Sequence, residues 1–280
     1  MDDMEMDDMD FHSKSEKLLN MLEKGAIACL NFVQSGGYSF SSRWPIALES
    51  FSFLMWQRVA EASNGFAMVM SCRGFSLGWS ISRIAFEHFL IQKKLDEIKD
   101  SENELSRFAD LLELQGTTYQ ERLDGILKKY QELSVFMKED HDERVQRCEK
   151  RSKELKETLG FNRKRVVDTK DLLNEEIPEF CKKNGLLNTW FVIQNNSNWH
   201  MHPDVRQWNV QFTRNEKDEI QLQEPSDDVI FQLSHLCLGI LGDSTVLANS
   251  ICPKVSESRE IKQHFEEVDN WINDWQGLGS

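Results

Sequence analysis

Proline and glycine are scarce in this sequence. The 280 residues include 5 prolines and 14 glycines, which is too few for many short strands joined by tight turns. Long helices are the natural alternative, and we predict a mainly α-helical bundle. With 40% hydrophobic and 29% charged residues, the composition is that of a globular protein and argues against extensive disorder.

Positive charge is also in short supply. Lysine and arginine number 33 against 47 acidic residues, so the net charge is −14. This balance excludes a chain-wide affinity for nucleic acid or anionic membranes, although a local basic surface is still compatible with it. Residues 1–10 carry acidic side chains and no base, which predicts a disordered acidic tail. Because a secretory signal needs a basic start and an apolar run, we predict a cytoplasmic protein with no membrane partner.

Several motifs that carry chemistry are missing. The six cysteines form no Cys-x-x-Cys pair, so we expect reduced, mostly buried thiols and neither a disulfide framework nor a zinc site. The sequence has no Gly-rich phosphate loop, dinucleotide fingerprint or Gly-x-Ser-x-Gly elbow. We therefore expect no cofactor.

The apolar residues recur at helical spacing along most of the chain. This pattern predicts helices over residues 10–34, 45–63, 66–99, 171–183, 186–200, 227–250 and 256–275. We expect Asn64 and Gly65 to break the second helix from the third. Between residues 207 and 223 the apolar period changes to two, which predicts one small β-hairpin. We assign residues 11–275 to a single helical domain and 276–280 to a flexible tail.

Residues 101–160 are highly charged and predict a protruding helical arm, as one long helix or a helical hairpin. Its apolar residues fall on one predicted stripe: Leu105, Phe108, Leu112, Tyr119, Leu123, Leu127, Tyr130, Leu133 and Phe136. Such an arm has little core of its own, so we expect a homodimer in which it packs against a second copy.

The predicted helix 66–99 carries charges among apolar residues. It is apolar almost all round, which indicates a buried central helix. Arg83 and Glu87 nevertheless share one face, about 40° apart. An isolated buried charge is strongly destabilising, so these two side chains must pair. Two interpretations stay open, namely a structural pair that orients the bundle and a polar pocket.

A second polar group lies at the end of the predicted helix 186–200. Asn196, Ser197 and His200 share a face there. We predict that Arg83, Glu87 and His200 meet in one partly buried cluster, because burying any of them alone is unfavourable. The helical Glu-x-x-His pattern of metal sites is absent, so we assign no metal.

These motifs resemble a known family. The sequence Ser-x-x-Arg-x-x-x-Glu ending at Glu87, followed about a hundred residues later by Asn-x-Ser-x-x-His ending at His200, resembles a bacterial family of helical domains grouped as HEPN-like. The resemblance covers roughly residues 51–249. It implies an α-helical bundle that dimerises. Active HEPN members are metal-independent endoribonucleases of toxin–antitoxin and phage-defence systems, and they use an Arg followed after a short spacer by a His.

That Arg–His spacing occurs twice here. The resemblance therefore implies a set of candidate catalytic residues: Arg83, Glu87, His88, His200, Arg259 and His264. A histidine would move the proton of an RNA 2′-hydroxyl, and an arginine would steady the developing phosphorane charge. Residues five apart lie about 140° apart around a helix, so a composite site across a dimer axis would be needed.

One segment of this acidic chain is basic. Residues 144–165 hold nine bases and three acids, which suits salt-dependent contacts to phosphates. The candidate RNA-binding residues are Arg144, Arg147, Arg151, Arg163, Lys164 and Arg165. The alternative is a solvated helix face with i,i+4 ion pairs.

Two functions follow from this sequence. The leading hypothesis is a HEPN-like RNA-binding or RNA-cleaving protein of a bacterial defence or toxin system, with a possible partner protein from the same operon. The alternative is a non-catalytic, dimeric helical interaction module whose Arg–Glu–His cluster is structural.

Overall fold

The chain divides into two compact units. The computed structural model describes residues 2–36, 38–40, 46–130, 141–161, 166–201, 212–214, 220–222 and 226–275. Within them the fold is mainly helical, as predicted. One unit comprises Met1–Asp96 and Cys181–Ser280, and the other Glu97–Phe180. This division differs from the single domain predicted over 11–275, which stays a prediction, and residues 97–180 bury apolar side chains of their own.

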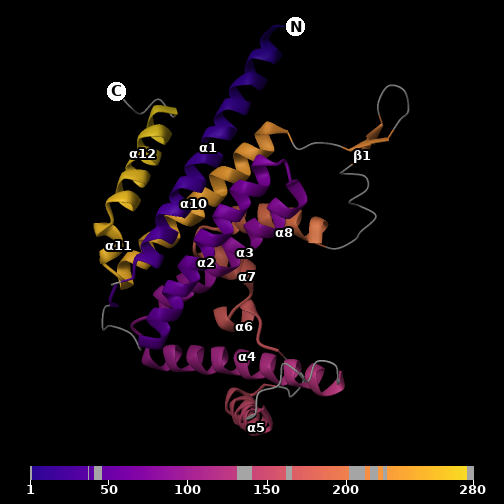
Figure 1. Cartoon of the computed structure of the whole chain (residues 1–280), viewed down its shortest axis with the longest axis vertical. Helices are drawn as coiled ribbons and strands as arrows, with labels where there is room; N and C mark the ends of the chain where they lie inside the picture. Colours follow the sequence, from indigo (N-terminus) through magenta and orange to yellow (C-terminus); the bar gives the residue numbers. More distant parts are fainter. Residues whose placement is uncertain are drawn as a thin grey trace. The chain divides into compact units, whose positions relative to one another are not determined.

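Three long helices form the centre of the first unit. Helices α1 (Asp2–Ser35), α2 (Ile46–Ser71) and α10 (Asp227–Ile251) pack against one another (Figure 1). Where they meet, Trp56 Nε1 donates a hydrogen bond to Thr245 Oγ1 at 3.1 Å, and Cys29 Sγ lies 3.8 Å from the same oxygen. One buried threonine thus joins side chains from all three helices.

Helix α1 starts earlier than the sequence predicted. It begins at Asp2, inside the segment assigned to a disordered acidic tail. Acidic side chains near a helix N-terminus interact favourably with the helix dipole, which accounts for the extension of the helix into this segment. The buried part of α1 begins near Ser15 and Leu18.

The break between the second and third helices also differs from the prediction. Helix α2 continues through Gly65 to Ser71, and α3 spans Phe75–Ile98. Burial of Phe66 and Met70 outweighs the cost of about 1 kcal/mol for a glycine inside a helix. A Cβ atom at Gly74 would lie 2.7 Å from Val69 Cγ1. The turn between α2 and α3 therefore needs a residue without a side chain at position 74.

Shorter elements complete the first unit. Helix α8 spans Leu187–Met201, α11 Lys254–Glu257 and α12 Arg259–Trp275, and α12 packs against α1. Strands β1 (Phe212–Arg214) and β2 (Ile220–Leu222) pair antiparallel, with Phe212 opposite Leu222. They fall within the range 207–223 predicted for a hairpin, and the other residues of that range lie outside those described.

The second unit contains the charged helices. Helices α4 (Glu102–Lys129) and α5 (His141–Leu159) pack together, and the short α6 (Thr169–Leu173) contacts α4. Helix α7 (Ile177–Lys183) crosses the division in the sequence. Helices α4 and α5 fall within the range 101–160 predicted as a protruding helical arm, and the arm itself stays a prediction.

The single apolar stripe predicted for the arm is wrong. Leu105 and Phe108 are buried as expected, but Leu111 and Leu114 join them, while Tyr119, with 69% of its surface exposed, faces outward. Leu123 and Tyr130 are exposed as well. The chain thus has two apolar faces on α4, of which only one packs inside the unit; Leu133 and Phe136 lie outside the described residues.

One property of helix α10 concerns the predicted cytoplasmic location of the protein. By length and composition alone it could cross a membrane, and 56% of its apolar window is buried inside the protein. Its place against α1 and α2 is that of a core helix. The cytoplasmic location stays a prediction.

Candidate functional site

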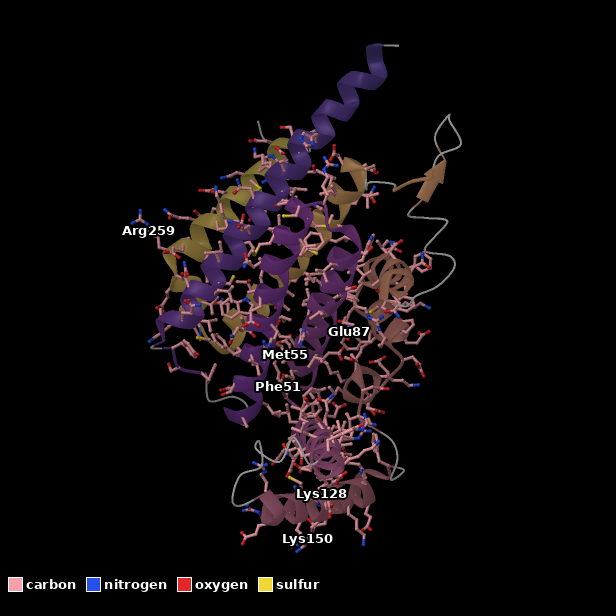
Figure 2. The ribbon with its side chains drawn as sticks, turned by 45° about the vertical axis from the view of Figure 1, so that its right-hand side comes forward. Phe51, Met55, Glu87, Lys128, Lys150 and Arg259 are labelled. Atoms are coloured by element: carbon pink, nitrogen blue, oxygen red, sulfur yellow. The ribbon has the colours of Figure 1, made fainter. Side chains whose placement is uncertain are left out.

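The predicted Arg83–Glu87 pair is present on α3. Arg83 Nε donates to Glu87 Oε1 at 2.8 Å, and the two side chains keep 25% and 36% of their surface exposed. Figure 2 labels Glu87 on this helix. Because water still reaches both groups, the pair stabilises the fold by at most about 1 kcal/mol. The pair is therefore half-buried.

The predicted meeting of this pair with His200 stays a prediction. His200 belongs to α8, but its side chain lies outside the described residues. Two neighbours that the sequence placed on the same face bond to their own helix. Asn196 Nδ2 donates to Val192 O at 2.8 Å, and the fully buried Ser197 donates to Gln194 O at 3.4 Å.

His88 has a defined tautomer. Its Nδ1 lies 2.7 Å from the carbonyl oxygen of Ile84, and because a carbonyl can only accept, Nδ1 carries the hydrogen and Nε2 keeps a lone pair. Burial lowers the pKa of His88, while the bond to Ile84 O and the charge of Glu87 act in the opposite direction. The imidazole is therefore neutral near pH 7.

Two residues of α2 that the sequence did not single out act electrostatically on His88. The charges of Arg58 and Glu61 both act on its pKa. Arg58 Nη1 donates to Glu61 Oε2 at 2.7 Å, and Gln57 Nε2 donates to Glu61 Oε1 at 2.8 Å. Arg58 and Glu61 stand out in the sequence as charged residues of a mainly apolar helix. Helical spacing, however, does not predict which faces of two helices lie against each other.

Exposed apolar side chains surround this group. Along the line where α2 and α3 adjoin, large apolar residues keep between 37% and 59% of their surface exposed: Leu54, Met68, Leu77 and Ile84. A Cβ atom at Gly65 of α2 would lie 3.9 Å from Ile81 Cδ1 of α3, which places the two faces together. The prediction that α3 is buried all round is therefore wrong.

We call this face the α2–α3 surface. It consists of Leu54, Arg58, Glu61, Met68, Leu77, Ile84 and His88. On each helix these residues recur at steps of three, four and seven, so they share one face. Arg83 and Glu87 lie on a neighbouring flank of α3.

The second Arg–His motif does not form a site within the unit. His264 is buried against α1, where a Cβ atom at Gly25 would lie 2.4 Å from its Nε2. Arg259 is exposed and points away from the helices (Figure 2). Residues five apart on α12 diverge, as helix geometry requires, so Arg259 and His264 do not meet within this chain, and a composite site across a dimer axis stays a prediction.

Two bases of the basic surface predicted on α5 have acidic partners on the neighbouring helix. Arg151 donates two hydrogen bonds to the Glu113 carboxylate, both at 2.7 Å, and Lys156 lies 3.7 Å from Glu121. This favours the alternative of a helix face with ion pairs. Arg147 is exposed and Arg144 is half-buried. The remaining candidates lie outside the described residues: Arg163, Lys164 and Arg165.

The buried thiols are unsuited to nucleophilic catalysis. Burial raises the pKa of Cys29 and of Cys181 to about 12, and it also raises the pKa of Cys237. A thiol with such a pKa stays protonated at neutral pH, and the thiolate is the reactive form. Over the described ranges, no three His, Cys, Asp or Glu side chains gather as metal ligands would.

No protein-family model, curated protein or solved structure matches this chain. The HEPN-like resemblance is therefore carried by the short motifs around Arg83, Glu87 and His200 alone. Family membership stays a prediction.

Proposed function

We propose that this chain is a helical interaction module that forms a homodimer through the α2–α3 surface. The observation that carries this proposal is the row of exposed apolar side chains on adjoining faces of two helices that are otherwise well packed. Large exposed apolar patches rimmed by polar groups mark protein-binding surfaces.

The charges on the α2–α3 surface suit a self-complementary contact. Arg58 and Glu61 present both signs within one turn of α2. A two-fold axis pairs each such group with the same group of a second copy, so that arginine can face glutamate in both directions. In this arrangement the Arg83–Glu87 pair orients α3 and has a structural role.

Light scattering at micromolar concentration tests the proposal. The wild-type chain should have the mass of a dimer, and Ile84→Asp should have the mass of a monomer because a charge replaces an apolar contact. The matched control is Ile27→Asp, which changes an exposed isoleucine of α1 outside this surface and should stay dimeric. A monomeric wild type, or an Ile84→Asp variant that still dimerises, would contradict the proposal.

A second candidate function, metal-independent RNA cleavage, is supported by the tautomer of His88. Its Nε2 lone pair is suited to accept the proton of a 2′-hydroxyl. The 2′-oxygen then attacks the adjacent phosphorus, the bond from phosphorus to the 5′-oxygen breaks, the 5′-oxygen takes a proton from water, and a 2′,3′-cyclic phosphate forms. Arg58, whose charge acts on His88, is the candidate source of positive charge for the phosphorane oxygens. A role in a bacterial defence or toxin system, and a partner protein from the same operon, are proposed only together with this second candidate function.

Incubation of the purified protein with RNA in the presence of a metal chelator tests the second candidate. Cleavage with cyclic-phosphate ends is expected, and His88→Gln should abolish it because the base is lost. His235→Gln, which changes a histidine of α10 outside the α2–α3 surface, should leave cleavage intact. Absence of cleavage, together with a dimer that needs Ile84, would leave the interaction module as the function.

A further inference from the structure

A groove of about 780 Å³ runs along the outer side of α10, between α10 and the α11–α12 segment. Its apolar lining includes Leu238, Val246, Phe265 and Ile272. Val246 keeps 69% of its surface exposed on this side of α10. We call this feature the α10–α12 groove.

Two glycines shape the α10 side of the groove. A Cβ atom at Gly239 would have no heavy atom within 4 Å, and one at Gly242 would lie 3.5 Å from a ring carbon of Phe265. Glycine there leaves the backbone of α10 open to close approach. The space is therefore not needed by the packing of the unit itself.

The rim of the groove is acidic. Asp243 of α10 and Glu266 and Asp269 of α12 line it, with Lys262 as the lysine among the lining residues. Helix α12 as a whole carries five acidic side chains and two basic ones. Two copies of this groove facing each other would bring like charges together, which opposes self-association here.

We infer that the α10–α12 groove binds an amphipathic helix of a partner protein, with an apolar face flanked by lysine and arginine. Grooves of this kind receive helices through apolar anchors at steps of three and four residues. The exposed Val246, the half-buried Phe265 and the glycine-lined wall provide the apolar contact. Asp243 and Asp269 select the basic flank, while Glu266 lies 3.8 Å from Lys262. This inference is independent of the homodimer proposed for the α2–α3 surface.

A synthetic helix serves as the probe. It has about 18 residues, leucines at positions i, i+4, i+7 and i+11, and lysines beside that stripe. A second peptide has the same leucines and glutamate in place of lysine. Calorimetry with the full chain at low and high salt should give binding of the lysine peptide that weakens as salt rises, and at least about tenfold weaker binding of the glutamate peptide.

Filling the groove is the decisive variant. Gly239→Leu projects a side chain into open space, so it should leave the fold intact and weaken binding of the lysine peptide at least about tenfold. Gly116→Leu on α4 is the matched control, because a Cβ atom there also meets no heavy atom within 4 Å. It should bind the peptide as the wild type does.

Charge variants test the rim separately. Asp243→Asn combined with Asp269→Asn should weaken the lysine peptide and flatten the salt dependence. The control is Asp274→Asn, which changes an acid of α12 that does not line the groove.

Four results would overturn the inference. The first two are no binding of the lysine peptide, or equal binding by Gly239→Leu. The third is loss of the dimer in Gly239→Leu, which would place a second copy in the groove. The fourth is binding to phosphatidylcholine–phosphatidylserine vesicles that Gly239→Leu abolishes, which would assign the groove to a membrane.

Discussion

The two units hold their helices together by different means. In the first unit, buried polar groups bond from helix to helix: Ser244 Oγ donates to Gln92 Oε1 at 2.5 Å, and Gln92 Nε2 donates to Ser244 O at 3.1 Å. In the second, exposed ion pairs such as Arg151–Glu113 join α4 to α5. The pair Arg151–Glu113 thus spans two neighbouring helices, and such ion pairs are the alternative to phosphate contacts for the bases of this segment.

Replacing Trp56 by alanine should have the largest effect on stability, and this effect should fall on the first unit. The indole is fully buried in the first unit and donates to Thr245, so the variant should lose about 3–5 kcal/mol of that unit's stability. Urea unfolding followed by circular dichroism measures the loss. The control Tyr119→Ala removes an exposed ring of the second unit and should change stability by less than about 0.5 kcal/mol. Equal losses in both variants would contradict the division.

Gly25→Ala should have the next largest effect. The added Cβ would lie 2.4 Å from Nε2 of His264, so α12 must shift away from α1, at a cost of about 1–3 kcal/mol. Thermal unfolding provides the measurement. Gly116→Ala is the matched control, since its Cβ meets nothing and alanine favours a helix. An unchanged melting temperature in Gly25→Ala would show that the contact with His264 is not tight.

The pH dependence of the first unit should be moderate. Burial lowers the pKa of His264 in the folded chain, Lys24 acts in the same direction, and Glu267 opposes them. The unfolded chain then binds the proton more readily. Stability from this group is complete above about pH 6.5, the ordinary value, and falls as the pH drops below it. His264→Gln should reduce the loss between pH 7.5 and 5.5 in urea unfolding, and an identical loss in the variant would refute this origin.

The smallest effect is expected from Arg151→Gln. Its hydrogen bonds to Glu113 lower the pKa of that carboxyl, but the pair is exposed and screened by salt. The variant should lower the melting temperature of the second unit slightly at low salt and not at 1 M salt. A double-mutant cycle with Glu113→Gln isolates the pair. A loss that persists at high salt would mean that the arginine contributes by packing.

The spacing of residues in the sequence correctly predicted the features that depend on a single helix. The range 227–250 closely matches α10, and the Arg83–Glu87 pair follows from an i,i+4 step. The helix break at Gly74 was missed because burial of Phe66 decides it, and burial depends on other helices. The charges of Arg58 and Glu61 that act on His88 were missed for the same reason, since no periodicity relates residues of two different helices.

The close fit of Gly25 beneath the His264 ring has a consequence for recognising relatives of this chain. The two positions are far apart in the sequence but share one volume, so they cannot vary independently. A related sequence with a larger residue at position 25 needs a smaller one at position 264. Paired change at these two positions would therefore indicate that a related chain keeps the α1–α12 contact, even where its motifs have diverged.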